Sequence, residues 1–481
     1  MILFELKSML SQESENSVLT NFVELSRIPR PSSSETQISE FIIKFAHERK
    51  LGCYKDEKGN LLVKIPSNST TLTRGVILQS HLDMVCLGEP DPATNGVTAT
   101  KEENGWLSAK ETTLGADDGI GIACSLSLMD EMGLEHGSLA FLFTVEEETG
   151  LGGAVHLDMP ELKNYSYMLN LDSEEEGRAI IGSAGSGISH ITLPINFEAA
   201  DQNMSFFDVD IKNLKGGHSG LDIDKGRTNA ILLLTEIFEQ AGQQETQIAS
   251  LEGGEAVNSI PKRLRMTIAT TNASGLSEKL QNLLKKHNEE QGTFSVTPVE
   301  SLSRQVLTRN SQKRLLKILT DIPNGVLQWD PEIKGLVYTS SNLGQITTQG
   351  NEIQMHLSYR SFADNPMLET KNKIEEVVKA SGGTILHEDI HSGWKQKPDS
   401  HLVKVVRDTY RELFGKELVV DAAHAGLECG LITLKYPQLE AISLGPTILD
   451  VHTITERVSV SSVEKLYLLL TRLIPELGKN M

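Results

Sequence analysis

Histidine and carboxylate residues form four short clusters in the first half of the chain. The clusters are His81-Leu82-Asp83, Asp117-Asp118, Glu146-Glu147-Glu148 and Asp172. Imidazole and carboxylate groups, without thiolates, suit zinc, manganese or cobalt ions. If the fold brings these clusters together, the chain carries the ligands of a metal centre.

Three of the clusters directly follow apolar runs. The run VILQS precedes His81, LAFLFTV precedes Glu146, and YSYMLNL precedes Asp172. Such runs, bounded by glycine and polar residues, predict buried parallel strands. Ligands of open α/β sheets bind outside the carboxyl ends of the strands. We therefore expect the clusters to meet at one edge of a parallel sheet, with Asp117-Asp118 at the mouth of a glycine-flanked helix.

Composition restricts the class of protein. The 481 residues, with 39% hydrophobic residues and 39 glycines, predict an α/β enzyme of about two or three domains. A formal net charge of -20 argues against nucleic acid or an anionic membrane as a partner. The four cysteines contain no C-x-x-C pair, so we expect neither a thiolate zinc site nor a disulfide framework.

The N-terminus and the hydrophobic runs indicate where the protein resides. The sequence MILFELKSMLSQES contains Glu5 and lacks a cleavage-type ending, which argues against a signal peptide. No stretch reaches the roughly 18 uninterrupted apolar residues of a membrane helix. We expect a reduced, soluble, cytoplasmic protein.

The order of the predicted elements divides the chain into two domains. Strand and helix patterns alternate over residues 1–184, which predicts βαβ units and a mostly parallel sheet with helices on both faces. Residues 185–393 alternate strands with helices in the manner of an inserted α+β domain. From Trp394 onward, a helix, a strand and a closing helix return to the first domain. We therefore expect one discontinuous domain, 1–184 and 394–481, interrupted by the inserted domain.

Local signals add three expectations. Ser32 and Glu35 have capping-box spacing ahead of an apolar helical face. The turn at residues 58–60 predicts a hairpin at the edge of the sheet. The helix that follows Asp118 is expected to end at Gly133.

Five strings, in order, carry a resemblance to a known family. They are LQSHLDMV, TTLGADDGIGIA, GGHSG, HAGLECG and SLGPT, the last followed by His452. Together with E-E-x-G and a strand that ends in Asp, they resemble the co-catalytic zinc peptidase superfamily. More closely, the chain is similar over its whole length to the bacterial aminoacyl-histidine dipeptidases within that superfamily.

The resemblance implies two divalent metal ions per chain. Zinc is the first choice, with manganese and cobalt as alternatives that accept the same ligands. One ion would be held by His81 and Asp172, and the other by Glu148 and His452. Asp117 would bridge the two ions.

The resemblance also assigns the catalytic groups. Glu147 would be the general base and acid, in a register of two Glu, one residue and Gly, which leaves Glu146 as an ordinary exposed residue. Asp83 lies two residues after His81, so on a strand both side chains point the same way and Asp83 can orient the imidazole.

At two positions the assignment of the metal ligands needs comment. Spacing alone allows either Asp117 or Asp118 to cap the following helix, and the resemblance favours Asp117 as the ligand. The late motif of the family is H-S-P-D-E, whereas this chain reads His452-Thr453-Ile454-Thr455-Glu456. That departure keeps the ligand and changes the loop around it.

The resemblance places substrate-binding residues in the inserted domain, a lid or dimerisation domain. His218 of GGHSG would hold the carbonyl oxygen, and Asn258 and Arg360 would bind the substrate carboxylate. In HAGLECG, His424 and Glu428 would lie near the pocket within the catalytic domain, and Glu428 could meet the substrate amino group. Each of these sites has a simpler alternative. His218 could be a surface histidine in a glycine-rich turn, Arg360 could form a structural salt bridge, and the glycines of HAGLECG could simply let the backbone turn.

These features predict a two-domain metallopeptidase that acts on small peptides. The favoured substrate is a dipeptide with a free N-terminus, of the Xaa-His (carnosine-like) type. The enzymatic alternative is an aminotripeptidase or N-acyl-amino-acid deacylase of the same superfamily. The non-enzymatic alternative is a metal-dependent binding protein without catalytic activity. The sequence leaves open the native metal, the choice between monomer and homodimer, and whether His218 acts in its own or a neighbouring subunit.

Overall fold

The computed structural model describes residues 12–131, 133–241, 245–272, 276–287, 289, 291–300, 304–331, 333, 335–394 and 398–480. Two compact units divide the chain. Unit 1 comprises residues 1–182, 394–422 and 427–481, and unit 2 comprises residues 183–393 and 423–426. The segment 423–426 therefore belongs to unit 2, although the sequence assigned it to the first domain. Most of the N-terminal sequence examined for a signal peptide, residues 1–11, lies outside the described residues.

Unit 1 is an α/β unit whose elements come from both ends of the chain. Its strands are β1 (Gly52–Lys55), β2 (Leu61–Ile65), β3 (Val76–His81), β4 (Ala99–Lys101), β5 (Trp106–Ala109), β6 (Leu139–Thr144), β7 (Tyr167–Asn170), β8 (Arg178–Ser183), β22 (Val419–Ala423), β23 (Glu440–Ser443), β24 (Ile448–Leu449) and β25 (Arg457–Ser459). Its helices are α2 (Gln12–Ser26), α3 (Thr36–Glu48), α4 (Pro92–Asn95), α5 (Ala116–Met129), α6 (Gly152–His156), the 3-10 helix η1 (Pro160–Asn164), α11 (His401–Phe414), α12 (Glu428–Lys435) and α13 (Val460–Gly478).

The main sheet of unit 1 has the strand order β1-β2-β6-β3-β7-β23-β8-β22. Its centre, β6-β3-β7-β23, is parallel, as the apolar runs predict. Antiparallel strands extend that centre on both sides, and the predicted hairpin β1-β2 lies at one edge. A parallel centre matters for the site because it brings the carboxyl ends of β3, β6 and β7 to the same side.

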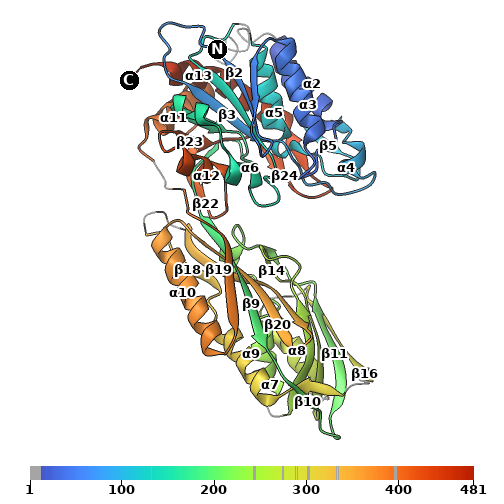
Figure 1. Cartoon of the computed structure of the whole chain (residues 1–481). Coiled ribbons are helices and arrows are strands. Elements are labelled where there is room, and N and C mark those ends of the chain that lie inside the picture. Colours follow the sequence, from blue (N-terminus) through green and yellow to red (C-terminus); the bar gives the residue numbers. More distant parts are fainter. Residues whose placement is uncertain are drawn as a thin grey trace. The chain divides into compact units, whose positions relative to one another are not determined.

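Helices cover both faces of this sheet, as Figure 1 shows. In β3, Val76 and Leu78 face a core formed with α2, α3, α5, α11 and α13, whereas Ile77 faces a second core formed with α6, η1 and α12. Burial on both faces explains why the strands read as continuous apolar runs rather than as alternating ones. The polar end of β3, from Gln79 to His81, is fully buried as well.

Two local expectations were wrong. Helix α3 begins at Thr36 with Glu35 at its N-cap position, where it makes no side-chain cap hydrogen bond, and Ser32 lies before the helix with its Oγ donating to Asp83 Oδ2 at 2.7 Å. Helix α5 ends at Met129 rather than at Gly133, and its cap residue is Asp130.

Unit 2 is built around an antiparallel sheet. Its strands are β9 (Gly185–Pro194), β10 (Phe197–Ala199), β11 (Ser205–Lys212), β12 (Gly217–His218), β13 (Thr246–Gly253), β14 (Ser259–Ile260), β15 (Leu264–Thr270), β16 (Thr293–Val299), β17 (Gln305–Leu307), β18 (Gly325–Trp329), β19 (Val337–Gln349), β20 (Glu352–Ser361) and β21 (Thr384–His391). Its helices are the 3-10 helix η2 (Ile223–Lys225), α7 (Leu233–Ala241), α8 (Leu276–Lys286), α9 (Arg309–Asp321) and α10 (Asp364–Ala380).

The large sheet of unit 2 has the order β16-β11-β15-β13-β19-β20-β9-β21, with β18 paired to β19. Alternate residues of these strands pack against helices α7 to α10 in a core separate from those of unit 1. Within the described residues, no helix is long and apolar enough to cross a membrane.

Candidate metal centre

The site lies in unit 1, where several chain segments reach the carboxyl edge of the parallel strands. Because β3 pairs in parallel with both β6 and β7, His81 at the end of β3 lies beside the loops that follow its two neighbours. Those loops carry Glu147, Glu148 and Asp172. The start of α5 supplies Asp117, and the loop after β24 supplies His452.

Asp117 lies at the centre of this arrangement. Its Oδ1 is 2.9 Å from Nε2 of His81, and its Oδ2 is 3.3 Å from Nε2 of His452. On the first side, Asp172 Oδ1 is 3.3 Å from the same His81 nitrogen. On the second side, Glu148 Oε2 is 2.9 Å from the same His452 nitrogen. Each oxygen of Asp117 therefore faces a different histidine and a different second carboxylate.

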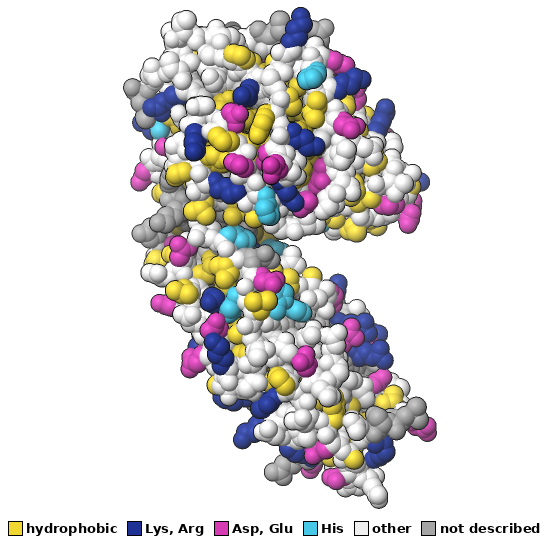
Figure 2. Space-filling view, viewed as in Figure 1, with side chains coloured by type: hydrophobic (Ala, Val, Ile, Leu, Met, Phe, Trp, Pro, Cys, Tyr) yellow, Lys and Arg dark blue, Asp and Glu magenta, His cyan; other side chains and the backbone are white. Residues whose placement is uncertain are grey.

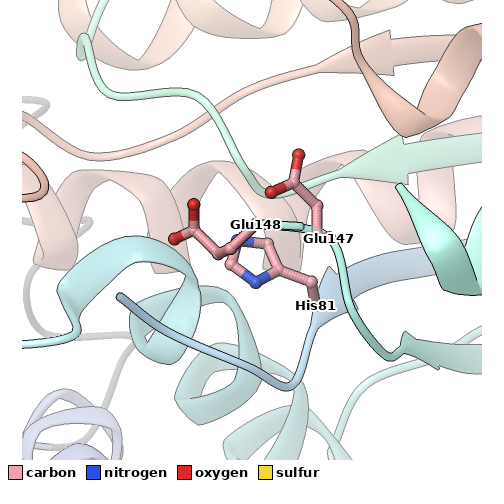
Figure 3. A group of neighbouring side chains, drawn as sticks. All are labelled: His81, Glu147 and Glu148. Carbon is pink, nitrogen blue, oxygen red and sulfur yellow. The ribbon is translucent and has the colours of Figure 1, made fainter. Parts of the chain in front are cut away.

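These donor atoms form compact groups. In His81-Asp117-Asp172 and in Asp117-Glu148-His452, one donor atom from each residue lies within 4.8 Å of the others. His81, Glu147 and Glu148 form a third such group, and the His81 imidazole lies between the two glutamates in Figure 3. Nitrogen and oxygen donors at this spacing, without a thiolate, fit divalent cations such as zinc, manganese and cobalt.

The electrostatics of the site also favour cations. Burial raises the pKa of Asp172 well above its ordinary value, and Asp117 adds to the effect. Burial opposes a charge on His452, yet its hydrogen bonds with Asp117 and Glu148 raise its pKa to about 11. A buried group of carboxylates needs protons or cations to balance its charge.

Asp83 links the histidine to the glutamates. It is fully buried, and its Oδ1 lies 3.6 Å from Nδ1 of His81. The same carboxylate accepts the backbone N–H groups of Glu147 at 3.0 Å and Glu148 at 3.1 Å. Burial raises the pKa of Asp83, but the hydrogen bonds from His81 and Ser32 and these N–H groups outweigh it and lower the value to about 2. Asp83 thus stays ionised and positions the His81 imidazole and the neighbouring loop together.

The two aspartates at the start of α5 have different partners. The peptide bond between Asp117 and Asp118 is cis. Asp118 accepts the N–H of Gly121 at 3.1 Å, which is a helix-start contact, and the N–H of His81 at 3.3 Å. The structure therefore brings Asp117 into both ligand groups and leaves Asp118 as a support for the helix and for β3.

The glutamates that follow β6 also differ in their surroundings. Burial raises the pKa of Glu147 well above its ordinary value. The charge of His81 acts to lower this pKa, and the charge of Glu148 acts to raise it further. Glu146, expected to be an ordinary exposed residue, instead forms an ion pair with Lys58 at 2.6 Å and is only 26% exposed. Its backbone N–H is bound by Glu35 at 3.0 Å, so this loop is held at each of its glutamates.

The predicted lid residues come together within unit 2. His218 in β12 pairs with Ser259 in β14, next to Asn258, whose carbonyl accepts the N–H of Ser219 at 2.8 Å. A Cβ at Gly220 would meet the carbonyl oxygen of His424 at 2.3 Å and would lie 3.3 Å from Nε of Arg360, so this turn requires glycine. The string GGHSG therefore allows the close approach that gathers His218, Arg360 and His424.

The protonation of this cluster follows from its contacts. Nδ1 of His218 accepts the N–H groups of Gly220 at 3.2 Å and Leu221 at 3.1 Å, so a neutral His218 carries its hydrogen on Nε2. Burial, with Arg360 and His218 nearby, lowers the pKa of His424 to about 3, and its Nε2 pairs with Ser340 Oγ at 2.7 Å. Burial also lowers the pKa of Arg360 to about 10. Among the described residues, the Arg360 Nε has no hydrogen-bond partner.

Glu428 belongs to unit 1, in contrast to His424 from the same string. It is fully buried, and its Oε2 accepts hydrogen bonds from Gln79 Nε2 at 2.6 Å and Thr144 Oγ1 at 2.7 Å. In this structure Glu428 is an interior carboxyl at the end of β3 and β6. Its contact with a substrate amino group stays a prediction.

Sequence reasoning missed the structural role of two residues that hold the segments carrying the candidate metal-binding groups. Arg30 is buried and donates to the carbonyls of Leu82, Asp83 and Gly115 at 2.9, 2.8 and 2.5 Å. Glu456 was noted only as a match to the family motif, yet it accepts backbone N–H groups from the segment that leads to Asp117. No spacing rule could find Arg30, because its partners lie far away in the sequence.

The chain is similar to known proteins over almost all of the given sequence. Residues 77–476 match the family described as Peptidase family M20/M25/M40. The cytosol non-specific dipeptidase of Escherichia coli (strain K12) is 33% identical, with 98% of this chain and 99% of that protein aligned. The crystal structure of the aminoacylhistidine dipeptidase from Vibrio alginolyticus matches with a TM-score of 0.81 and 30% identity, over 98% of each chain. Aminopeptidase PepT from Bacillus cereus shares the fold, with a TM-score of 0.63 and 18% identity over 97% of this chain and 99% of that one.

Proposed function

The chain belongs to the peptidase family M20/M25/M40, and on this basis we propose that it is a metal-dependent dipeptidase. Its substrates are dipeptides with a free N-terminus, and the Xaa-His class is the favoured one. Of two similar proteins, the first, a cytosol non-specific dipeptidase, supports dipeptides in general, and the second, an aminoacylhistidine dipeptidase, supports the Xaa-His class. The name of the first also supports a cytoplasmic location.

One observation carries the proposal. Asp117 turns one carboxylate oxygen to His81 and the other to His452, and each histidine has a further carboxylate beside it. A shared carboxylate with two sets of end ligands is the arrangement required by a pair of cations about 3.5–4 Å apart.

We propose two divalent cations per chain, zinc in the first instance, with manganese or cobalt as substitutes. His81, Asp117 and Asp172 would hold one cation, and Asp117, Glu148 and His452 would hold the other. When bound, the cations would polarise the scissile carbonyl and lower the pKa of a water molecule.

Residues of the chain would transfer the proton and hold the reacting groups in position. Glu147 lies beside His81 and Glu148, so its carboxylate can take a proton from the attacking water and return it to the leaving amine. In the absence of cations, burial raises the pKa of Glu147, which is the direction that favours uptake of a proton. Asp83 fixes both the His81 ring and the Glu147 backbone while this happens.

Unit 2 would supply the substrate contacts. His218, with its hydrogen on Nε2, can donate to a carbonyl oxygen that becomes negative during the reaction. Arg360 has a buried Nε without a hydrogen-bond partner among the described residues, which suits a group that binds the carboxylate end of a dipeptide. Asn258 lies beside His218 through the β12–β14 pair and would add an amide contact.

The test is a metal count together with a substrate panel. Purified protein is analysed for metal per chain and assayed with carnosine, Ala-Ala, a tripeptide and an N-acyl amino acid. About two metal ions and selective cleavage of dipeptides, carnosine among them, would support the proposal. A preference for the tripeptide or the acyl compound would make the chain an aminotripeptidase or deacylase with the same mechanism. No turnover after addition of zinc, manganese or cobalt would leave a metal-dependent binding protein.

A further inference from the structure

Unit 2 carries a second cluster of histidines on the side of its sheet that faces away from the helices. Along β9 and β20, one residue in two packs against α7 to α10, and His190 and His356 belong to the other set. Histidine side chains are visible on the surface of this unit in Figure 2. The two strands are antiparallel, and His190 lies directly opposite His356 in their register.

The two imidazoles meet through the same type of atom. Nδ1 of His190 is 2.7 Å from Nδ1 of His356, and the ring centroids are 4.8 Å apart at an angle of 73°. On its other side, Nε2 of His190 lies 3.2 Å from Oε2 of Glu388 in the neighbouring strand β21. The three side chains thus form a line, carboxylate to imidazole to imidazole, across three adjacent strands.

We propose that His190 and His356 bind a divalent transition-metal ion through their Nδ1 atoms, and that Glu388 positions His190 for it. Two imidazole nitrogens that converge on one point suit Zn²⁺, Ni²⁺ or Cu²⁺. A histidine that binds a metal generally donates its other ring N–H to a carboxylate or carbonyl, which fixes its tautomer. Glu388 is placed to receive that hydrogen bond from Nε2 of His190.

The hydrogen bonds determine the tautomers before an ion binds. If Nε2–H of His190 donates to Glu388, then Nδ1 of His190 is an acceptor, and the hydrogen between the rings belongs to His356. Replacing that hydrogen by an ion requires His356 only to move its hydrogen to its own Nε2. Both rings remain neutral, which is the form that binds metals.

The spacing requires only a small adjustment. Zinc–nitrogen distances of about 2.0–2.1 Å, with angles near those of a tetrahedron, separate the two nitrogens by roughly 3.3 Å. The rings would therefore move apart by about half an ångström, which side-chain rotation can supply because the His190 side chain is 36% exposed. The strand register holds both Cβ atoms in place, so most of the site exists before the ion arrives. Water would complete the coordination on the open side.

This site shares no residue with the candidate metal centre of unit 1. Its ligands belong to unit 2 alone, whereas the ligands named for the catalytic cations belong to unit 1. Its failure would leave the proposed dipeptidase activity untouched. An ion there would join β9 to β20 and stabilise the folded form of unit 2 according to its affinity and concentration.

The experiment is a metal-binding comparison on the full-length protein without a histidine tag. Chelator-treated wild type, His190→Ala and His356→Ala are each dialysed against Zn²⁺ and, separately, Ni²⁺, and the bound ions per chain are counted. The matched control is Gln354→Ala, which changes a half-buried residue of β20 on the same face as His356. Wild type and Gln354→Ala should bind one ion more per chain than either histidine variant. Glu388→Gln should keep the ion with an affinity about 10–100-fold lower.

A cooperative thermal unfolding transition of each chelator-treated variant serves as the check that it is folded, which does not depend on the proposed dipeptidase activity. If an alanine variant fails this check, His356→Gln takes its place, because glutamine preserves most of the side-chain volume. Equal ion counts in wild type and in folded variants of both histidines would overturn the proposal.

Discussion

Glu456 holds the backbone of Asp117 from more than three hundred residues away in the sequence. Its Oε1 accepts the N–H of Asp117 at 3.4 Å and that of Ala116 at 2.8 Å. Its Oε2 accepts the N–H groups of Leu114 at 2.8 Å and Gly115 at 3.0 Å. The residue that both cations would share is therefore positioned by the segment that also carries His452.

Glu456→Gln should weaken metal binding without removing any ligand. The amide presents a donor where the carboxylate presented a second acceptor, so two of the N–H groups lose their partner and the segment before Asp117 loosens. We expect the zinc affinity to fall about 10–100-fold, measured by dialysis of the chelator-treated protein. Glu175→Gln is the control, because Glu175 is exposed and pairs with Arg178. An unchanged zinc affinity in Glu456→Gln would show that the loop is held by other contacts.

Glu147→Gln should separate catalysis from metal binding. The amide cannot take a proton from water, so kcat should fall by about 10²–10⁴-fold while the metal count stays the same. The neighbouring change Glu146→Gln is the matched control, since Glu146 lies on the same loop as Glu147, pairs with Lys58 and should retain turnover. Normal activity of Glu147→Gln would exclude Glu147 as the base.

His218→Ala should lower kcat by about 10²–10³-fold and leave the metal content alone, because it removes one donor to the developing oxyanion. The measurements are steady-state kinetics with a dipeptide and metal analysis of the same sample. His287→Ala, which removes another unit 2 histidine that pairs with Glu236, should behave like wild type. Loss of metal in His218→Ala would instead identify His218 as a ligand.

Glu428 should make the metal-free protein less stable as the pH rises. Burial raises the pKa of Glu428 to about 7, although the charge of His81 and the hydrogen bonds from Thr144 and Gln79 act to lower it. A carboxyl with a raised folded-state pKa contributes its full stability below its unfolded pKa, near 4.3, and that contribution is lost as the pH rises through about 7.

Glu428→Gln removes this titration and keeps a carbonyl oxygen for both hydrogen bonds. Between about pH 5 and about pH 8, the wild type should lose roughly 2–3 kcal/mol more of its free energy of unfolding than the variant does. Urea unfolding of the chelator-treated proteins at both pH values measures the difference. Parallel pH profiles of wild type and variant would mean that Glu428 ionises normally in the fold.

The parallel strands and their polar ends were predictable from sequence because their cause is local. The runs before His81, Glu146 and Asp172 are apolar without alternation, and they form β3, β6 and β7 with both faces covered. Placing clusters after such runs predicts that they share an edge. The structure brings them together there, although His452 could be assigned only through the family resemblance.

The supports of the site were less predictable because their partners are distant in the chain. Ser32 has the spacing of a helix cap, but the buried carboxylate of Asp83 takes its hydroxyl. Arg30 offers no local pattern, and its role follows from three carbonyls that only the folded chain brings near it. Glu146 resembles a solvated residue until Lys58 is seen beside it. Residue spacing describes one segment of the chain at a time, whereas each of these contacts joins two segments that are distant in the sequence.

The order in which the chain is synthesised gives the late position of His452 and Glu456 a consequence of its own. His81, Asp117, Glu148 and Asp172 are made before unit 2 begins, and His452 and Glu456 only after it has ended. A nascent chain at that stage therefore carries the proposed base Glu147 and the candidate group His81-Asp117-Asp172, but it lacks both His452 and the hydrogen bonds of Glu456 to the backbone around Asp117. On the ribosome the proposed peptidase would remain inactive until the segment that carries His452 and Glu456 has emerged.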